Sequence, residues 1–459
     1  MAGVKPLIYA ELLSNIRQVS VIAALNTPSD SSTRVEVLDG GRQILVSHQD
    51  LSSVLILPGQ VTLYSQLQQP VSGQKEVSWR LPLASAPSSG RVVANLQENE
   101  TPWSARDLGE DAEFSCRECS AIIIKNGSIK DWKDLPSENW AEMMEFWHCH
   151  KPDVPKHEQN GPNNGSSDHK HHSHTDSNAN RGYGANSKFI ARKSTGFVDP
   201  TTFLLASADC SNIQGLQKSE LSNKQLDYQP LSCLGCNQYL GIVDPQAEGV
   251  RLYKWRLLCN SRPSSQPNGS TTGSILEAPS LSVFFASELI RMHLSQCVSR
   301  ILLSPISWKP AQVSTTPTKT SFPKFISLWV LSPGLKVSGL GASPDSPVNS
   351  SNDLNSTTQS LLRSLQLNPK RPGSSKGNST SKSSQIACGL KVKLFWNHVD
   401  EKAAIELQDR EDTEELSLPV EAIEELSACL QNSANILPPS ARRFQTWNVG
   451  LLDRYEQPR

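Results

Sequence analysis

The chain has 459 residues, and its 44 basic and 45 acidic side chains give a formal net charge of −1. Apolar residues make up 37% of the chain and charged residues 19%, so long polar insertions are expected between ordinary globular segments. A chain without net charge has no global field that attracts nucleic acid or an anionic membrane. Composition therefore argues against both partner classes and favours a protein partner.

The first 24 residues show no targeting signal. Their apolar pattern is interrupted by Glu11, Asn15 and Arg17, so it lacks the continuous apolar core of a signal peptide. No stretch reaches the roughly 18 apolar residues that cross a bilayer. We therefore expect a soluble intracellular protein, whose ten cysteines are thiols or metal ligands because the compartment is reducing.

Residues 1–108 are predicted to form an antiparallel β domain. Two pairs of short apolar runs each surround a tight turn. Arg34–Leu38 and Gln43–Val46 flank an Asp-Gly-Gly turn, and Ser53–Leu57 and Val61–Tyr64 flank a Pro-Gly pair. β-Branched residues on both sides of a glycine-containing turn are typical of β-hairpins.

Residues 109–260 are predicted to form a second β domain that carries one helix and one long insertion. Ala121–Ile124 is strand-like, and the apolar spacing within residues 135–147 predicts a short helix with Ser137 as its N-cap. Residues 151–187 contain almost no aliphatic side chains. Such a segment cannot offset the entropy lost on ordering, so we predict that it is disordered.

Residues 275–459 are predicted to form an α+β region, interrupted by a disordered Ser-, Asn- and Pro-rich linker at 343–384. Leu281–Leu303 is predicted as a helix with strand-like ends. Gly389–His398 alternates apolar and polar residues as a strand does, and Val420–Leu430 has helical spacing. The fold class predicted for the whole chain is mainly β with some α, in antiparallel β domains with short helices and long insertions.

Two Cys-x-x-Cys pairs, Cys116/Cys119 and Cys233/Cys236, carry the strongest chemical signal. Two thiolates separated by two residues can bind one ion from a tight turn, and two such knuckles complete a tetrahedral zinc site with four cysteine ligands. We predict a structural zinc ion that staples the sheets. Two alternatives stay open: the cysteines are ordinary small apolar residues, or they form a redox dithiol, which usually needs a thioredoxin-like βαβ setting.

Cys149 lies between His148 and His150, directly after Trp147. A thiol beside imidazoles can be stabilised as a thiolate, which suits nucleophilic attack on a thioester. Three roles stay open for this segment: a half-buried cysteine at a helix end, a nucleophile with Trp147, His148 and His150 as partner contacts, or a metal ligand. Four further histidines are interpreted as a solvated tract without function: His169, His171, His172 and His174.

The second cysteine pair and the strands expected after it resemble a known zinc module. Cys233–Val243 and Val250–Leu257 have the order of a Cys-x-x-Cys pair, a Leu-Gly pair and a strand. This order is similar to that of β-tent modules such as those of the yippee and cereblon families. The resemblance covers about 30 residues and implies a pair of sheets clamped by one zinc ion without an open catalytic position.

Four segments together resemble the HECT-like E2-binding family of ubiquitin-protein ligases. They are the two cysteine pairs, the Pro-Ser-Glu-Asn-Trp to Trp-His-Cys-His segment at 135–150, and Arg443–Gly450. The resemblance implies an E3 ligase of the cytoplasm and nucleus. It would bind a ubiquitin-conjugating enzyme (E2) and promote ubiquitin transfer to a protein substrate of the cyclin B class. The resemblance also implies association with the mRNA cleavage and polyadenylation endonuclease.

The C-terminal tail departs from the pattern of true HECT ligases. Their catalytic cysteine lies in a motif like Leu-Pro-x-Ala-x-Thr-Cys-Phe, whereas this tail places Arg443 before Phe444. Arginine cannot form a thioester. A covalent ubiquitin intermediate would therefore need Cys149, Cys388 or Cys429, and we interpret Cys388 and Cys429 as packing residues.

The residues themselves favour binding over catalysis, because no Ser/His/Asp triad, phosphate-binding loop or carboxylate pair is visible. The alternative to a ligase is a non-catalytic zinc scaffold that inhibits or chaperones the endonuclease.

Overall fold

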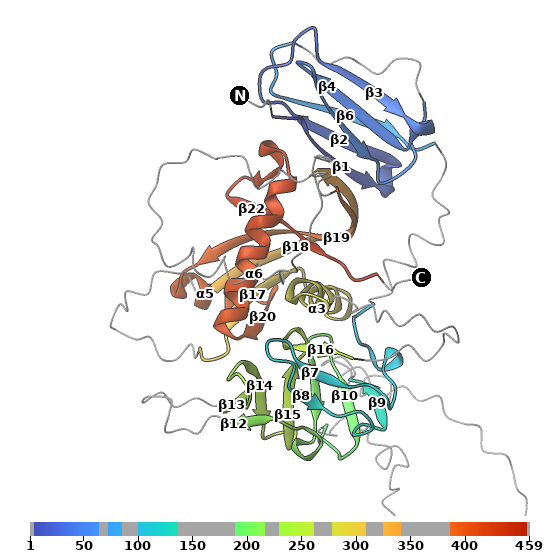
Figure 1. Ribbon diagram of the computed structural model, residues 1–459. Helices are drawn as coiled ribbons and strands as arrows, with labels where there is room; N and C mark the ends of the chain where they lie inside the picture. Colours follow the sequence, from blue (N-terminus) through green and yellow to red (C-terminus); the bar gives the residue numbers. More distant parts are fainter. Residues whose placement is uncertain are drawn as a thin grey trace, which may run out of the picture. The chain divides into compact units, whose positions relative to one another are not determined.

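A computed structural model shows a mainly β protein with a few short helices (Figure 1), which confirms the predicted fold class. The predicted insertion at 151–187, the linker at 343–384 and the helix within 135–147 lie outside the residues that the structure describes. At 386–388 only the backbone is described. The described residues are 4–63, 72–84, 100–135, 189–215, 229–260, 278–308, 325–340 and 386–456.

The chain divides into two compact units. The first comprises Met1–Ala86, Lys336–Gly389 and Asn435–Ala441. Its described strands form two groups, and neighbouring strands within each group are antiparallel. One group contains β1 (Leu7–Leu13), β2 (Gln18–Ala24), β6 (Glu76–Pro82) and the end of β18 (Phe325–Leu340), and the other contains β3 (Arg34–Leu38), β4 (Gln43–His48) and β5 (Leu51–Ile56).

The core of the first unit follows from the alternation of its strands. In β4 every second side chain is buried, including Ile44 and Val46. These residues pack in one apolar cluster with Val21 of β2 and with Leu55 of β5. Alternation places one face of each strand inside, so the predicted hairpin of β3 and β4 is confirmed.

The second predicted hairpin of this unit is wrong. Val61 does not return along β5 but forms a bridge with Leu83. Its amide donates to the Gly41 carbonyl at 2.9 Å. Gly41 has φ +92, and a Cβ there would lie 2.1 Å from the Val61 carbonyl oxygen. This close backbone approach directs the chain away from β5 after the Pro-Gly turn.

The second unit comprises Pro87–Leu335, Leu390–Ala434 and Arg442–Arg459. Its described residues from 100 to 260, here named the cysteine module, form a seven-stranded sheet in the order β12-β13-β14-β15-β11-β10-β9 and a three-stranded sheet in the order β16-β7-β8. All described pairs are antiparallel except β9 with β10. The strands are β7 (Phe114–Cys116), β8 (Ile122–Ile124), β9 (Asp131–Asp134), β10 (Thr195–Val198), β11 (Thr202–Leu205), β12 (Ile213–Gly215), β13 (Gln229–Cys233), β14 (Tyr239–Asp244), β15 (Gly249–Tyr253) and β16 (Leu257–Cys259).

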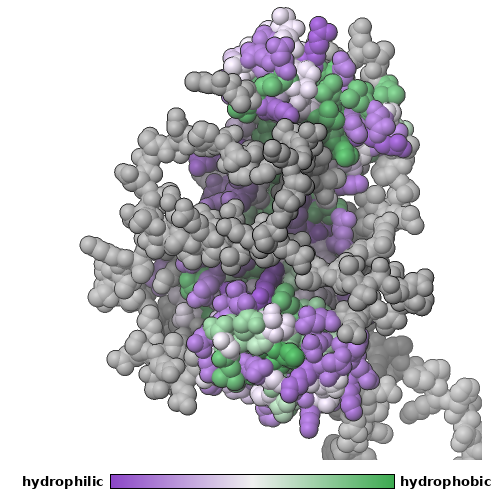
Figure 2. All heavy atoms as spheres, in the orientation of Figure 1, coloured by the Kyte–Doolittle hydropathy of each residue, from purple (hydrophilic) through white to green (hydrophobic). Residues whose placement is uncertain are grey.

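Aromatic rings fill the space between the two sheets of the cysteine module. Phe203 lies 4.9 Å from Phe114 and 5.3 Å from Trp132, measured between ring centroids. Both Phe203 and Phe114 are fully buried. Figure 2 shows hydrophobic residues gathered near the middle of the visible face of this module, with hydrophilic residues around them. Inside the module, the rings of Phe114, Trp132 and Phe203 contact one another and join the two sheets.

The rest of the second unit is a sheet covered by helices. Its strand order is β20-β17-β18-β19-β22-β21, with β17 parallel to β20. The additional strands are β17 (Arg300–Pro305), β19 (Ile386–Val399), β20 (Thr413–Leu418), β21 (Arg443–Phe444) and β22 (Trp447–Asp453), and the described helices are α3 (Leu281–Ser295), α5 (Glu401–Gln408) and α6 (Val420–Ser433).

Helices α3 and α6 pack on one face of this sheet and α5 on the other. Leu328 and Leu394 belong to one apolar cluster with residues of α3 and α6, whereas Phe325 clusters with Ala404 of α5. The predicted helix at 420–430 and strand at 389–398 are confirmed. Among the described residues, no helix is both long enough and apolar enough to cross a membrane.

Candidate metal centre

The two cysteine pairs sit at the ends of strands from different sheets, and both turns have the same geometry. Cys116 ends β7, and Cys233 ends β13. In each turn the amide of the first cysteine donates to the carbonyl five residues later, and its carbonyl accepts from the amide four residues later. The residues at that fourth position, Ser120 and Asn237, both have positive φ, at 60° and 58°. Each pair is thus a preformed knuckle.

The structure brings the four predicted cysteines together. All four sulfur atoms lie within 4.8 Å of one another. The Sγ atoms of Cys116 and Cys236 are 3.7 Å apart, and those of Cys119 and Cys233 are 3.5 Å apart. A tetrahedral site with Zn–S bonds of about 2.3 Å places its sulfurs about 3.8 Å apart. The four cysteines therefore lie close enough to bind one metal ion.

Gly235 makes room for this sulfur cluster. A Cβ at this position would lie 3.2 Å from the Cys119 Sγ and 3.8 Å from the Cys233 Sγ. A side chain there would crowd the Cys119 sulfur and would be in ordinary van der Waals contact with the Cys233 sulfur. The glycine of the Cys-Leu-Gly-Cys knuckle thus leaves space beside the Cys119 sulfur.

The electrostatics of the sulfurs differ across the cluster. Burial raises the pKa of Cys116 to about 12 and also raises the pKa of Cys236. The amide of Ala121, which donates to the Cys119 sulfur, is the main cause that lowers the pKa of Cys119. Ionising all four thiols needs a strong positive charge, which a coordinated divalent cation supplies.

The geometry argues against the two alternatives for these cysteines. The close sulfur contacts join one knuckle to the other rather than the two cysteines of one pair, and both pairs follow antiparallel strands. A redox dithiol would need its reactive pair within one Cys-x-x-Cys turn. A role of these cysteines as ordinary packing residues is also disfavoured, because Cys119 and Cys236 are exposed.

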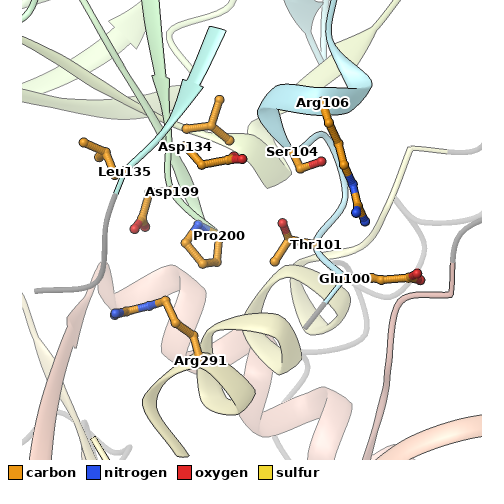
Figure 3. A pocket seen from close by; sticks show the side chains of 10 residues that line it. Glu100, Thr101, Ser104, Arg106, Asp134, Leu135, Asp199, Pro200 and Arg291 are labelled. Atoms are coloured by element: carbon orange, nitrogen blue, oxygen red, sulfur yellow. The ribbon is translucent and has the colours of Figure 1, made fainter. Parts of the chain in front are cut away.

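A surface pocket of about 370 Å³ lies beside the module and has charges of both signs (Figure 3). Asp134 and Asp199 lie across it from Arg291 of α3. Asp134 accepts a hydrogen bond from the Ala105 amide at 2.9 Å, and Arg291 pairs with Glu288 at 2.5 Å. Because its charges are mixed and already bonded within the protein, the pocket indicates no single ligand class.

Lys254 is fully buried and binds the turn directly before Ser104. Its Nζ donates to the carbonyls of Pro102 and Trp103 at 3.2 and 3.1 Å, and it lies 5.0 Å from the centroid of the Phe203 ring. Burial lowers the pKa of Lys254 to about 7, although the carboxylates of Asp199, Asp134, Asp107 and Glu288 oppose this shift. A lysine in this setting titrates near neutral pH.

This burial predicts a pH-dependent stability. The pKa of lysine is about 10.4 in an unfolded chain, so between pH 7 and that value the unfolded state binds more protons at Lys254 than the folded state. The free energy of unfolding therefore rises with pH, by up to about 1.4 kcal/mol per pH unit from this group. Urea unfolding at pH 6.5, 7.5 and 8.5 should show this rise in the wild type relative to Lys254→Met. If the unfolding free energy of the wild type and of Lys254→Met changed equally with pH, the lowered pKa of Lys254 would be contradicted. The control is Lys402→Met, at a side chain that is 87% exposed.

Most of the other predicted site residues lie outside the part of the chain that the structure describes. Trp147, His148, Cys149 and His150 lie outside the described residues, as do the four further histidines of the predicted loop. Cys388 lies in the first three residues of β19, 386–388, for which only the backbone is described.

Cys429 lies on α6, and its surroundings are described. Its pKa is raised by burial and by the nearby charges of Glu425 and Asp453. A raised thiol pKa is the opposite of an activated nucleophile, which supports a packing role for Cys429.

The tail motif at Arg443–Gly450 is a hairpin of β21 and β22. Phe444 pairs with Trp447 across the turn and stacks on Phe395 with a centroid distance of 5.1 Å. A Cβ at Gly450 would lie 2.7 Å from a methyl group of Leu430, so glycine allows α6 to pack closely there. Arg443 is exposed on β21.

The sequence-based reasoning missed three polar residues of this unit. Arg117 and Lys254 each bind backbone carbonyls with their cationic groups, and Cys297 is an exposed thiol outside the sulfur cluster. In sequence, Arg117 lies next to Glu118 and resembles a solvated surface charge. Lys254 lies between Tyr253 and Trp255, and no local pattern records which carbonyls it binds.

Two known proteins are similar to short parts of this chain. Over 82 residues it is 35% identical to the uncharacterized protein YJR141W of Saccharomyces cerevisiae, which covers 17% of this chain and 24% of that protein. Over 62 residues it is 40% identical to the uncharacterized protein C1734.10c of Schizosaccharomyces pombe, covering 13% and 18%. The alignments thus span a quarter or less of these relatives, and no solved structure matches the chain.

A family model covers most of the chain. The family is described as HECT-like ubiquitin-conjugating enzyme (E2)-binding, and its match extends over residues 11–449. This range contains both cysteine knuckles, α3, α6 and most of the tail hairpin. The protein therefore belongs to the HECT-like E2-binding family, which points to a role related to ubiquitin conjugation.

Proposed function

We propose that this protein is an E3 ubiquitin-protein ligase, which binds an E2 and promotes ubiquitin transfer to a protein substrate. The observation that carries the proposal is the match to an E2-binding family over residues 11–449. The resemblance seen in the sequence adds a substrate of the cyclin B class and action in the cytoplasm and nucleus. Imaging of a fluorescent fusion protein tests the location.

The four-cysteine centre is proposed to hold a structural zinc ion. Cys116, Cys119, Cys233 and Cys236 would be its ligands, and the spacing of their sulfurs supports this assignment. When bound, zinc would form four metal–thiolate bonds, and its two positive charges would offset part of the negative charge of the four thiolates. Four protein ligands leave no open coordination position, so the role of the centre is to hold β7 against β13.

Ubiquitin transfer through this protein can proceed in one or two steps. In one step, the amine of a substrate lysine attacks the thioester carbonyl between E2 and ubiquitin. The C–S bond breaks, an amide bond forms, the E2 thiol is released and the amine loses a proton to solvent. In two steps, the Cys149 thiolate first attacks the E2 thioester, which forms a second thioester on Cys149 and releases the E2 thiolate. The substrate amine then attacks this second thioester, the amide bond forms and the Cys149 thiolate is released. Trp147, His148 and His150 are the proposed contacts with the E2.

Reconstitution with E1, a panel of E2 enzymes, ubiquitin and ATP tests the ligase proposal. We expect the protein to bind at least one E2 and to become ubiquitinated itself. A ubiquitin adduct that reductant removes, and that Cys149→Ser abolishes, would establish the two-step route. Cys297→Ser is the matched control because Cys297 is exposed and lies outside the sulfur cluster. A protein that stays inert and captures no E2 from the panel would refute the proposal.

The second candidate function is a non-catalytic zinc scaffold that inhibits or chaperones the mRNA cleavage and polyadenylation endonuclease. Arg443 favours it, because this exposed residue of β21 occupies the place of the HECT nucleophile and cannot form a thioester. The scaffold requires that Cys149→Ala retains function while Cys233→Ala loses it. Equal tolerance of both substitutions would refute the scaffold.

A further inference from the structure

Arg117 joins the first cysteine knuckle to the start of helix α3. It is the residue directly after Cys116, inside the knuckle. Its guanidinium donates to the carbonyls of Trp255 at 3.1 Å, Pro279 at 2.9 Å and Ala278 at 3.0 Å. Its backbone amide donates to the Arg256 carbonyl at 3.0 Å. One knuckle side chain therefore fixes two separate backbone segments.

The carbonyls that Arg117 binds lie at the point where α3 begins. Ala278 and Pro279 directly precede Ser280, the N-cap residue of α3. The Ser280 side chain makes no capping hydrogen bond to the helix, although helix starts usually depend on such a bond. The direction in which α3 begins is thus set from outside the helix, by the guanidinium.

Helix α3 is the element on which the core of the unit depends. Phe284 and Leu289 are fully buried in the cluster that also contains Trp255 and the sheet residues Leu328 and Leu394. Phe284 also lies 5.3 Å from Trp103 of the cysteine module, measured between ring centroids. A loose helix start would disturb both sides of this core.

We propose that Arg117 is a positioning residue that couples metal binding at the four-cysteine centre to the ordering of α3. The inference rests on the metal-binding part of the proposed function. A bound metal fixes Cys116 and Cys119 and, between them, the direction of the Arg117 side chain. The planar guanidinium then reaches three carbonyls at once, which the point charge of a lysine cannot reproduce. Loss of the metal frees the knuckle, and the three carbonyls lose their common donor.

Lys254 provides an internal comparison. Its buried Nζ also binds two backbone carbonyls, those of Pro102 and Trp103. It lies after β15 rather than in a knuckle, so its contacts do not depend on the position of a metal ligand. Of these two cations, only Arg117 is held between cysteines of the centre.

Hydrogen exchange of the α3 amides in the full chain tests the coupling, with and without metal. Metal content is measured first. A chain that holds no metal overturns the metal part of the proposed function, whereas bound metal with uncoupled α3 overturns only this inference. In the wild type, chelation should raise the exchange rate of α3 at least about fivefold, within the usual range of coupling between sites. In metal-bound Arg117→Gln, the α3 amides should exchange at least about fivefold faster than in the metal-bound wild type.

Glu118→Gln is the control variant, because it changes the exposed neighbour of Arg117 in the same knuckle. It should behave as the wild type does. Coupling is reciprocal, so zinc should leave Arg117→Gln about tenfold faster than it leaves Glu118→Gln, measured as transfer to a coloured chelator. This second measurement needs no stable metal-free state. Equal release rates for the two variants, or unchanged α3 exchange in metal-bound Arg117→Gln, would overturn the inference.

Discussion

Cys233→Ala is expected to remove the metal ion and to unfold the cysteine module. Cys233 is buried at the end of β13, with its sulfur 3.5 Å from that of Cys119 on the opposite knuckle. Structural zinc sites contribute roughly 10–16 kcal/mol of apparent binding free energy, which is as large as the whole stability of a typical domain at about 5–15 kcal/mol. The remaining three sulfurs cannot close the site.

Metal analysis and a thermal melt followed by circular dichroism measure this effect. Cys297→Ser is the control, since it removes an exposed thiol outside the cluster and should leave the metal content and the melt unchanged. If Cys233→Ala retained one equivalent of metal and melted as the wild type does, the cluster would not be the brace between β7 and β13.

Phe203→Ala is expected to lower the free energy of unfolding by about 3–5 kcal/mol, the usual range for removing a buried aromatic ring. Phe203 is fully buried and its ring contacts those of Phe114, Trp132 and Trp103. Its ring also faces the Lys254 ammonium group at 5.0 Å. The substitution therefore opens a cavity and removes a favourable contact of a buried cation.

Urea unfolding monitored by tryptophan fluorescence gives the change in unfolding free energy for this variant. The matched control is Phe444→Ala, at a ring that is 50% exposed and stacks on Phe395. Its effect should stay below about 1.5 kcal/mol, the value of an aromatic pair. Similar losses for both variants would show that the rings of the cysteine module do not form its central support.

The parts of this fold that depend on local chemistry could be predicted from the sequence. Cys116 and Cys119 identify a knuckle because two residues between thiols form a turn, whatever follows in the chain. Helix α6 follows from its apolar spacing at Val420, Ile423 and Leu426, all residues that face the core or its edge.

Features that depend on distant partners could not be predicted. The last residues of β18 pair with β1 across more than 300 positions of sequence, and no local pattern records that pairing. Helix α5 was missed although Asp400 caps it by accepting from the Ala403 amide at 2.8 Å, because its apolar face is narrow. Arg117 was missed for the same reason as the pairing of β18 with β1, since two of the carbonyls that give it a role lie 161 and 162 positions away.

Under the proposed ligase activity, the enclosure of Lys254 excludes its amine as an acceptor in self-modification. An amine that attacks a thioester carbonyl has to approach it in solvent, and the Lys254 side chain has no exposed surface. Lys402, on the outer face of α5, is 87% exposed and can make that approach. The sites of ubiquitin attachment on this protein would thus be its accessible lysines. Lys254 would stay unmodified as long as the module is folded.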